Sequence, residues 1–444
     1  KANTFPFIPI CLTMTVTIQK DVWSDDATPY AVLSRFNRFG TPHEQDWWKK
    51  TGRLLSKVLE AAQYSQDRQY EALLFYSQIL IPRLGPYPSV FRSAITRSGL
   101  PLEFSVNYQQ HSVAGHVVRI GLEPVAEASG TTKDPYNQKP IIELLDKLEK
   151  LGPPGFNASL FNHFLEAHTL SEQESQELGA DARPGTILTS QAAFGFDLQP
   201  ETISVKGYTF PGLKTQVKSQ GFGSIINKSL IPLKESIGPF PAFDLVDGYM
   251  AATDGYSQFA FWSFDCADNT KARLKLYSAH NSVIWSKIQE IWTLGGRVDT
   301  PVVQKGLEYL RELWRLTGIS EGDRAFTGGF DDGKDATPTP MVWNYEMRVG
   351  EAMPLTKFYF PVHGENDERI IRGLAKFLAH IGLVSDGNNL ENVIQGFYPN
   401  LQLSKTSRLI SWISFAYTEK TGVYLSVYYH SSEDYPWAEE EAKA

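Results

Sequence analysis

Cysteine is scarce in this chain of 444 residues, which has only Cys11 and Cys266. The two lie far apart in the sequence and cannot build a disulfide framework, so we expect a reducing compartment, the cytoplasm. Long apolar runs are also missing. The stretch from Phe5 to Ile18 resembles a targeting segment, but two prolines interrupt it and it is too short to span a bilayer. We therefore expect a cytoplasmic protein with no membrane partner.

An excess of positive charge is missing as well. The chain has 42 basic and 50 acidic residues and no block rich in Lys and Arg, which argues against a nucleic-acid partner. GxSxG, a P-loop and GxGxxG after a strand are absent, and the nine histidines show no metal-ligand spacing, so hydrolase, kinase and dehydrogenase functions lack support. Any anion that the protein binds must meet a local cluster of cations.

Aromatic residues are abundant, at 13% of the chain, and predict aromatic-rich strands or an aromatic-lined pocket. Apolar residues three and four apart predict helices, whereas two-residue alternation predicts strands. The expected helices are 46–62, 139–152, 281–296, 306–319 and 369–383, and the expected strands are 101–108, 116–125, 202–210, 272–279, 355–362, 409–417 and 423–430. Because these strands carry polar residues at every second position, one face of the sheet must be polar and either enclosed or wet.

A Lys-x-Tyr pattern recurs in these strands. It occurs at Lys206 and Tyr208, at Lys275 and Tyr277, and at Lys357 and Tyr359, and Tyr428 lies in a fourth strand. The tyrosines are 69, 82 and 69 residues apart, which indicates a repeated unit with helices between the strands. Any single copy is better explained by an amphipathic strand with its polar side in solvent. Because the lysines and tyrosines occupy equivalent positions in several strands, the whole set favours side chains that face one common interior.

If the sheet closes into a barrel, its interior collects five cations: Arg119, Lys206, Arg273, Lys275 and Lys357. Repulsion and desolvation oppose such a cluster, so we expect a polyanionic ligand, most simply a diphosphate, to resolve the conflict. Arginine gives planar bidentate contacts to phosphate, and lysine adds point charge. Tyrosine faces stabilise a carbocation held over them, so the combination suits ionisation of an allylic diphosphate.

One acidic motif points to another chemistry. The residues Asp331 to Asp335, DDGKD, match the DDxxD pattern that holds Mg²⁺ on helices. Here the motif lies in a stretch rich in Gly and Pro, where carboxylates four residues apart do not share a helix face. We expect a solvated loop and no metal.

Longer motifs support a resemblance that covers nearly the whole chain. They are EQDWW (44–48), GLPLEFSVN (99–107), GTTKDPYN (130–137), VKGYTFP, ARLKLY, IWTLGG (291–296), TKFYFP and SWISFAY with YLSVYY. With these motifs the chain resembles the fungal indole prenyltransferases of the dimethylallyltryptophan synthase family.

The resemblance implies an α/β fold with a ten-stranded antiparallel prenyltransferase barrel ringed by helices and built from repeated α-α-β-β units. We expect residues 21–444 to form this single domain, after an extension of residues 1–20 that is poorly ordered. It also implies chemistry that needs no metal or cofactor, with dimethylallyl diphosphate as co-substrate.

Site residues follow from the same resemblance. Arg119, Lys206, Arg273 and Lys275 match the diphosphate-binding residues, and Lys357 stands where relatives often have glutamine. Tyr208, Tyr277, Tyr359 and Tyr428 match the tyrosine shield, and Trp412 stands where many members have tyrosine. Glu103 matches the glutamate that accepts the indole N–H. We expect its carboxylate to stay ionised in the cationic interior; an ion pair with one of the cations is the structural alternative.

The expected acceptor pocket contains Leu102, Ala193 and Ala260. Alignment places Ala193 where tryptophan-prenylating members have lysine, and Ala260 where they have an arginine for the carboxylate of tryptophan. We therefore expect an acceptor that is larger than tryptophan and neutral: a tryptophan-containing cyclic dipeptide, an indole alkaloid or an indole diterpene. A phenolic or polycyclic aromatic acceptor, or a non-catalytic barrel that binds an isoprenoid diphosphate, remains as an alternative. The oligomeric state is expected to be monomer or homodimer.

Overall fold

The computed structural model describes residues 28–89, 91–112, 115–178, 189–253, 255–256, 260–324 and 339–433. Within these ranges ten antiparallel strands close into a barrel, in the order β1-β12-β11-β10-β9-β6-β5-β4-β3-β2. The strands are β1 Leu102–Gln109, β2 Val117–Leu122, β3 Ala192–Leu198, β4 Ile203–Thr209, β5 Phe261–Asp265, β6 Leu274–His280, β9 Met341–Met347, β10 Leu355–Phe360, β11 Ile410–Thr418 and β12 Gly422–His430. The expected extension of residues 1–20 and the DDGKD motif lie outside the described residues.

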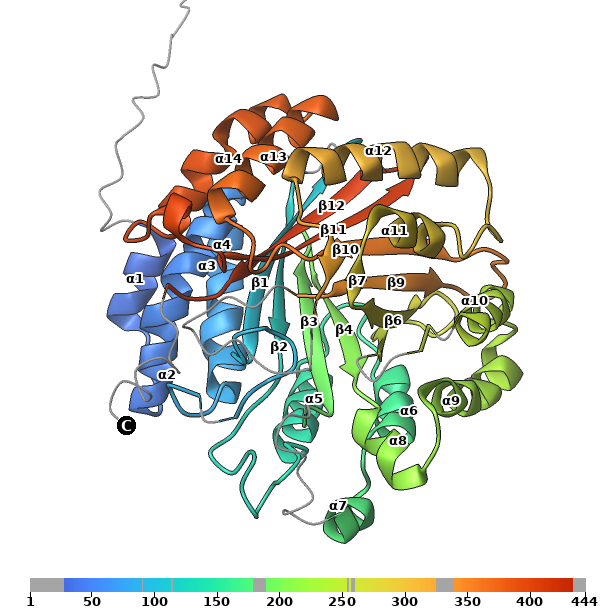
Figure 1. Ribbon diagram of the computed structural model, residues 1–444. Helices are drawn as coiled ribbons and strands as arrows, with labels where there is room; N and C mark the ends of the chain where they lie inside the picture. Colours follow the sequence, from blue (N-terminus) through green and yellow to red (C-terminus); the bar gives the residue numbers. More distant parts are fainter. Residues whose placement is uncertain are drawn as a thin grey trace, which may run out of the picture.

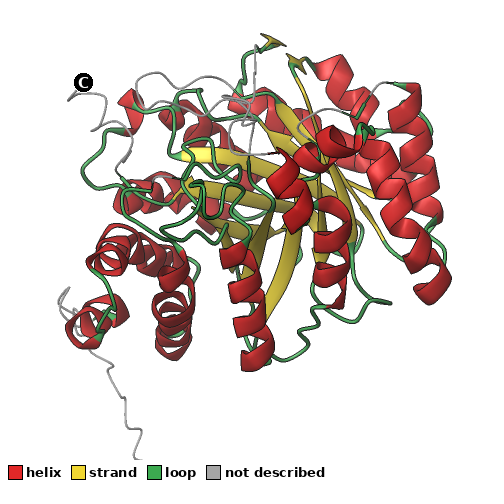
Figure 2. Ribbon diagram, turned by 90° about the horizontal axis from the view of Figure 1, so that it is seen from below, coloured by secondary structure: helices red, strands yellow, loops and turns green. Residues whose placement is uncertain are grey.

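Helices lie around the outside of the barrel (Figure 1). They are α1 Pro29–Phe36, α2 Pro42–Trp47, α3 Arg53–Ala61, α4 Gln66–Phe75, α5 Lys139–Leu151, α6 Ser159–His168, α7 Glu172–Leu178, α8 Gly212–Lys218, α9 Phe222–Ile237, α10 Pro241–Ala252, α11 Trp285–Trp292, α12 Pro301–Thr317, α13 Asp367–His380 and α14 Val384–Phe397. Figure 2 shows the strands enclosed by helices when the molecule is turned. Helical segments alternate with strand hairpins along the chain, which confirms the expected α-α-β-β repeat.

Strand alternation separates the core from the barrel interior. In β12, Val423, Leu425, Val427 and Tyr429 are buried in the main hydrophobic core, which lies between the strands and the helices. The residues between them face the interior, which we call the lumen. Apolar stripes on the helices complete the core; α13, for example, contributes Ile370, Leu374 and Phe377. None of the helices in the described ranges is long and apolar enough to cross a membrane.

The structure corrects two parts of the secondary-structure prediction. The expected helix 281–296 begins only at Trp285, because Ser282–Val283 forms a short strand, β7, that pairs with β8, Gly322–Asp323. Strands β3, β5 and β9 were not predicted. In β3 the lumen positions are occupied partly by Ala193 and Gly195, so the polar alternation that marks the other strands is weak.

The close contact between β4 and the helix layer gives a test of the core. A Cβ at Gly207 would lie 2.3 Å from Cε2 of Phe264 and 2.7 Å from Cδ2 of Phe161. We expect Gly207→Ala to lower the free energy of unfolding by about 1–3 kcal/mol because a packed core resists added volume. Gly396→Ala in α14 is the control, since a Cβ there meets nothing within 4 Å. It should raise the free energy of unfolding by about 0.5–1 kcal/mol. Urea unfolding followed by tryptophan fluorescence measures both; an unchanged midpoint for Gly207→Ala would contradict this packing.

Candidate active site

The register of the barrel brings the predicted polar residues onto one face. Arg119 lies opposite Asp197, Lys206 opposite Asp265, and Lys275 opposite Glu346. Residues directly opposite each other on neighbouring strands point to the same side of the sheet. The lumen therefore receives four of the predicted cations from strands, Arg119, Lys206, Lys275 and Lys357, while Arg273 precedes β6 by one residue.

One group of charges centres on Asp197. Its Oδ1 lies 3.0 Å from Nε of Arg119, and its Oδ2 lies 2.5 Å from Nζ of Lys206. Burial alone would raise the pKa of Asp197, but the two cations outweigh it and hold that pKa far below its usual range. The carboxylate therefore stays ionised and fixes both cations.

A second group centres on Asp265 and Glu346. Arg273 donates to both oxygens of Asp265, from Nε at 2.6 Å and from Nη2 at 3.0 Å. Nζ of Lys275 lies 3.8 Å from Asp265 and 3.9 Å from Glu346, so it sits between the two carboxylates. Nη1 of Arg273 lies 3.7 Å from Oε2 of Glu346, which is beyond hydrogen-bond distance, so its N–H groups can still donate to another acceptor.

The three carboxylates correct the expectation that only a ligand could neutralise the five cations. The chain itself supplies Asp197, Asp265 and Glu346 at the same level of the lumen, which we call the cation level. Five cations against three carboxylates leave two positive charges in excess when all are ionised. In the described part of the chain, no group of three or more His, Cys, Asp and Glu side chains is arranged to hold a metal ion.

Two lysines of the cation level are poised to gain charge when an anion enters. Burial, together with nearby cations, lowers the pKa of Lys206 to about 7 despite its contact with Asp197. Burial, with Arg119 beside it, also lowers the pKa of Lys357 well below its ordinary value. The ammonium of Lys357 lies 4.5 Å from the centroid of the Tyr424 ring. A bound polyanion would raise both pKa values and hold both protons.

Five aromatic rings form the next level of the lumen, which we call the aromatic level. It contains Tyr208, Tyr277, Tyr359, Tyr428 and Trp412. Centroids of successive rings lie 6.4 Å apart for Tyr208–Tyr277, 5.9 Å for Tyr277–Tyr359, 6.0 Å for Tyr359–Tyr428 and 6.5 Å for Tyr359–Trp412. The predicted aromatic residues therefore come together around one space, with Asn344 donating to the Tyr359 hydroxyl at 3.3 Å.

Glu103 belongs to a third level, beyond the aromatic rings. It lies opposite His430 on β12. Tyr428 lies two residues before His430 on that strand, and Ser426, which accepts a hydrogen bond from Arg119, lies two residues before Tyr428. Each such step is about 7 Å. The aromatic level consequently separates Glu103 from the cation level. We call this third group, Glu103 with Ser411 and His430, the carboxyl level.

The protonation of Glu103 differs from the sequence prediction. Burial raises the pKa of Glu103 to about 8, and a hydrogen bond from Ser411 lowers it only in part. The Oγ of Ser411 donates to Oε2 of Glu103 at 2.9 Å. Neither the expected ionised state nor the alternative ion pair with a cation describes this site. Because the cations lie beyond the aromatic level, they do not offset the burial of Glu103, and its raised pKa favours the protonated form at neutral pH.

Two residues expected in the acceptor pocket do not reach it. Leu102 is fully buried in the main hydrophobic core, because it precedes Glu103 and must face the opposite way. Ala260 also belongs to that core, and the next residue, Phe261, faces the lumen and stacks on Tyr277 at 4.2 Å. Ala193 does face the lumen, opposite Tyr208. Ala193 and Phe261 thus add neutral side chains to the lumen beside Tyr208 and Tyr277 of the aromatic level.

The sequence analysis missed four contributors to the site: Asp197, Asp265, Glu346 and Ser411. The three acids lie on the three strands that were not predicted, β3, β5 and β9. A usable signal was present in β9, where Met341, Trp343, Tyr345 and Met347 alternate with Asn344 and Glu346. Ser411 gave no such signal, since it occupies an irregular position in β11.

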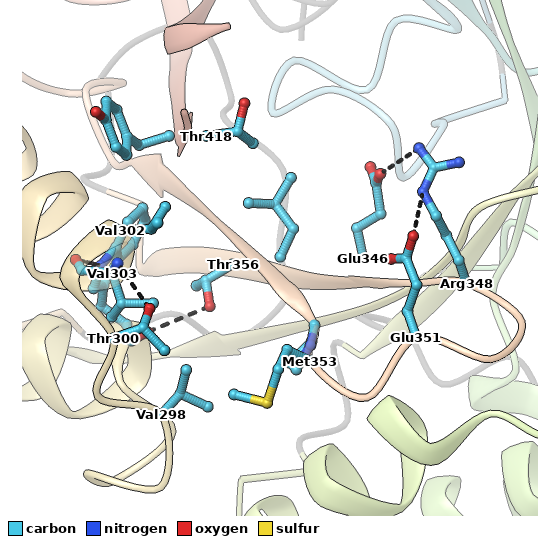
Figure 3. A pocket seen from close by; sticks show the side chains of 14 residues that line it. Val298, Thr300, Val302, Val303, Glu346, Arg348, Glu351, Met353, Thr356 and Thr418 are labelled. Atoms are coloured by element: carbon cyan, nitrogen blue, oxygen red, sulfur yellow. Dashed lines mark hydrogen bonds and ion pairs between the residues drawn. The ribbon is translucent and has the colours of Figure 1, made fainter. Parts of the chain in front are cut away.

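A cavity of about 370 Å³ lies beside the end of the β9–β10 hairpin and is lined in part by Glu346 of the cation level. Figure 3 shows Arg348 between Glu346 and Glu351, across the cavity from Val298 and Val302. Arg348 lies 3.4 Å from Glu346 and 3.9 Å from Glu351. Glu346 therefore joins this outer cation to Arg273 and Lys275 of the cation level.

A barrel whose lumen holds cations at one level, aromatic rings at the next and a carboxyl group beyond defines an aromatic prenyltransferase. The model of the family described as tryptophan dimethylallyltransferase matches residues 43–391. The chain is 58% identical to prenyltransferase phqI of Penicillium fellutanum, over 94% of this chain and 95% of that protein. It is 44% identical to deoxybrevianamide E synthase of Aspergillus versicolor, over 93% of this chain and 96% of that protein.

A solved structure of NotF with brevianamide F and DMSPP superposes with a TM-score of 0.83 at 41% identity, over 91% of this chain and 99% of that chain. The chain belongs to the tryptophan dimethylallyltransferase family, and it is a dimethylallyl transferase that acts on indoles in secondary metabolism.

The position of Glu103 predicts a pH dependence. A group that accepts a proton must be ionised, and the raised pKa means that the ionised fraction grows as pH rises through about 8. At saturating donor, kcat/KM for the acceptor should therefore rise with pH up to that value. Glu103→Gln should remove this limb and lower kcat/KM by about 100- to 10,000-fold, with donor binding retained. An identical pH profile in Glu103→Gln would contradict the assignment.

Lys206 predicts the opposite dependence for the donor. In the unliganded enzyme Lys206 loses its proton as pH rises through about 7, so donor affinity should fall over that range. Arginine keeps its charge at every accessible pH. Lys206→Arg should therefore show a flatter plot of donor Kd against pH between 6 and 8.5, measured by calorimetry with a non-hydrolysable donor analogue. Parallel plots for the two proteins would show that Lys206 does not govern donor binding.

Proposed function

We propose that the enzyme transfers a dimethylallyl group from dimethylallyl diphosphate to the indole ring of a tryptophan-containing cyclic dipeptide, without a metal ion. The observation that carries the proposal is the order of the lumen, in which an aromatic level separates the cation level from Glu103. Donor and acceptor ends are thereby distinct. The names of the relatives, deoxybrevianamide E synthase and NotF with brevianamide F, support an acceptor of this class.

The cation level binds the diphosphate in this proposal. Two positive charges in excess and the spare N–H groups of Arg273 meet the phosphate oxygens, in the place that Mg²⁺ takes in other diphosphate chemistry. The C1–O bond of the donor breaks, and the electron pair leaves with the diphosphate. Because the carboxylates fix Arg119, Lys206 and Arg273 before the donor binds, little reorganisation is needed as charge develops on the leaving group.

The aromatic level shields the allyl cation while the acceptor attacks. The faces of Tyr277, Tyr359 and Trp412 carry negative charge density that stabilises a cation and exclude water that would otherwise capture it. A carbon of the indole ring supplies the electron pair for the new C–C bond, and Glu103 takes up the indole N–H proton. Where the attacked carbon carries hydrogen, that proton is lost and Glu103 returns its proton to the nitrogen, so that one proton leaves overall and the aromatic ring is restored.

The neutral acceptor end supports a substrate without free charges. Ala193 and Phe261 line the lumen beside Tyr208 and Tyr277, and neither can pair with a carboxylate or an ammonium group. A cyclic dipeptide has both its termini joined in amide bonds, whereas free tryptophan would bring two charges into this space at a desolvation cost. We propose that the enzyme works in the cytoplasm as a monomer or homodimer.

The function is tested by pyrophosphate release from dimethylallyl diphosphate in EDTA, followed by mass spectrometry. The acceptors compared are tryptophan, tryptophan-containing cyclic dipeptides, indole diterpenes and phenols. We expect a cyclic dipeptide to gain one dimethylallyl group and to exceed tryptophan in kcat/KM by about tenfold or more. Faster turnover of a phenol would overturn the acceptor class, and turnover only after Mg²⁺ is added would overturn the metal-independent mechanism. Failure with every acceptor would favour a non-catalytic barrel.

A further inference from the structure

Strand β11 departs from regular pairing beside Glu103. Ile410 lies opposite Tyr429 and Trp412 lies opposite Tyr428, so Ser411 is an extra residue in the strand. In a regular strand, neighbouring residues face opposite sides of the sheet, and a bulge is what allows two in succession to serve one side. Both residues reach the lumen here. The Trp412 ring joins the aromatic level, 6.5 Å from Tyr359, and Ser411 donates to Glu103.

The contact with Ser411 distinguishes the two carboxyl oxygens of Glu103. Oε2 accepts from Ser411 at 2.9 Å. Oε1 lies on the side of Gly121 on β2, where an added Cβ would still be 4.0 Å away. No side chain of Gly121 covers this oxygen, because glycine has none. With Oε2 held by Ser411, Oε1 is the oxygen left for a further hydrogen bond, on the side where Gly121 has no side chain.

Ser411 is a suitable partner for both protonation states of Glu103. A hydroxyl group is one donor and also an acceptor. When Glu103 is ionised, Ser411 donates to Oε2. When Glu103 carries a proton on Oε2, that O–H can donate to Ser411, whose own hydrogen then turns to the backbone oxygen of Tyr428, 3.4 Å away. The orientation of the carboxyl group is thus kept while the proton comes and goes.

We propose that Ser411 is a positioning residue for the reaction. Its hydroxyl holds Glu103 so that Oε1 meets the N–H of the acceptor, and the bulge delivers this hydroxyl and the Trp412 ring to the lumen together. The inference rests on the proposed function, in which Glu103 takes up the indole N–H proton. It adds that the geometry of Glu103 on β1 is set from β11, with β12 between the two strands, by a residue that need not touch either substrate.

The test compares Ser411→Ala and Ser411→Thr with the wild type, using whichever acceptor the wild type turns over. Loss of a hydrogen bond to a charged group should lower kcat/KM for the acceptor by about 10- to 100-fold in Ser411→Ala. The pH limb assigned to Glu103 should also move to higher pH, because the hydroxyl that favours the ionised form is gone. Ser411→Thr keeps the hydroxyl and should restore both values. Donor Kd should stay unchanged.

Two controls separate positioning from general damage. Ser414→Ala removes a hydroxyl from the same strand and should leave the pH limb where it is in the wild type. In a Glu103→Gln background, Ser411→Ala should have no further effect on kcat/KM, because Ser411 acts through Glu103. A wild-type pH limb in Ser411→Ala, or an equal loss with and without Glu103, would overturn the inference and show a structural role only.

The same variants distinguish failure of the proposed function from failure of the inference about Ser411. If Glu103→Gln keeps the wild-type pH limb, Glu103 does not accept the proton, and the mechanism and the inference both fall. If Glu103→Gln loses the limb and Ser411→Ala leaves it in place, the mechanism stands and only the inference falls. Absence of turnover with every acceptor overturns both.

Discussion

The whole site depends on the two-residue alternation of strands in a barrel that is closed. Closure leaves no edge at which the register can slip, so every strand must keep the same phase toward the lumen. Tyr208, Tyr277, Tyr359 and Tyr428 come from four different strands and still meet around one space for this reason. The helices outside the barrel contribute few groups to the chemistry. They bury the strand side chains that face outward, and this burial fixes the pairing of the strands.

Electrostatics determines which residues can occupy the strand positions that face the lumen. Five cations at one level would repel one another, and the barrel resolves this within the chain by placing Asp197, Asp265 and Glu346 among them. The carboxylates do not cancel the charge, but they fix its geometry, which is what a leaving diphosphate requires. At the other end Glu103 lies beyond the aromatic level and out of reach of this compensation. Burial therefore dominates its protonation, and one barrel contains a strongly ionised end and a nearly neutral end.

Much of this arrangement could be predicted from the sequence, because repeated Lys-x-Tyr strands carry both phase and spacing. The resemblance then supplied the role of Glu103. The three acids could not be recognised as partners of the cations without knowing which strands are neighbours. Leu102 and Ala260 were assigned wrongly to the acceptor pocket. Alignment locates the right segment of the chain, but the alternation of the strand decides which of two adjacent residues faces the lumen. The protonation of Glu103 depends on distances across the barrel, which no local pattern contains.

The stacking of levels along the barrel axis also bears on how such enzymes diversify. Each strand contributes to several levels through residues two positions apart, so a substitution at one height leaves the neighbouring heights in register. In the function proposed above, a substitution at the height of Glu103 changes which acceptor fits, while the cation level further along the same strands stays intact. Single substitutions can therefore change the product while the enzyme stays active, because the donor site is kept.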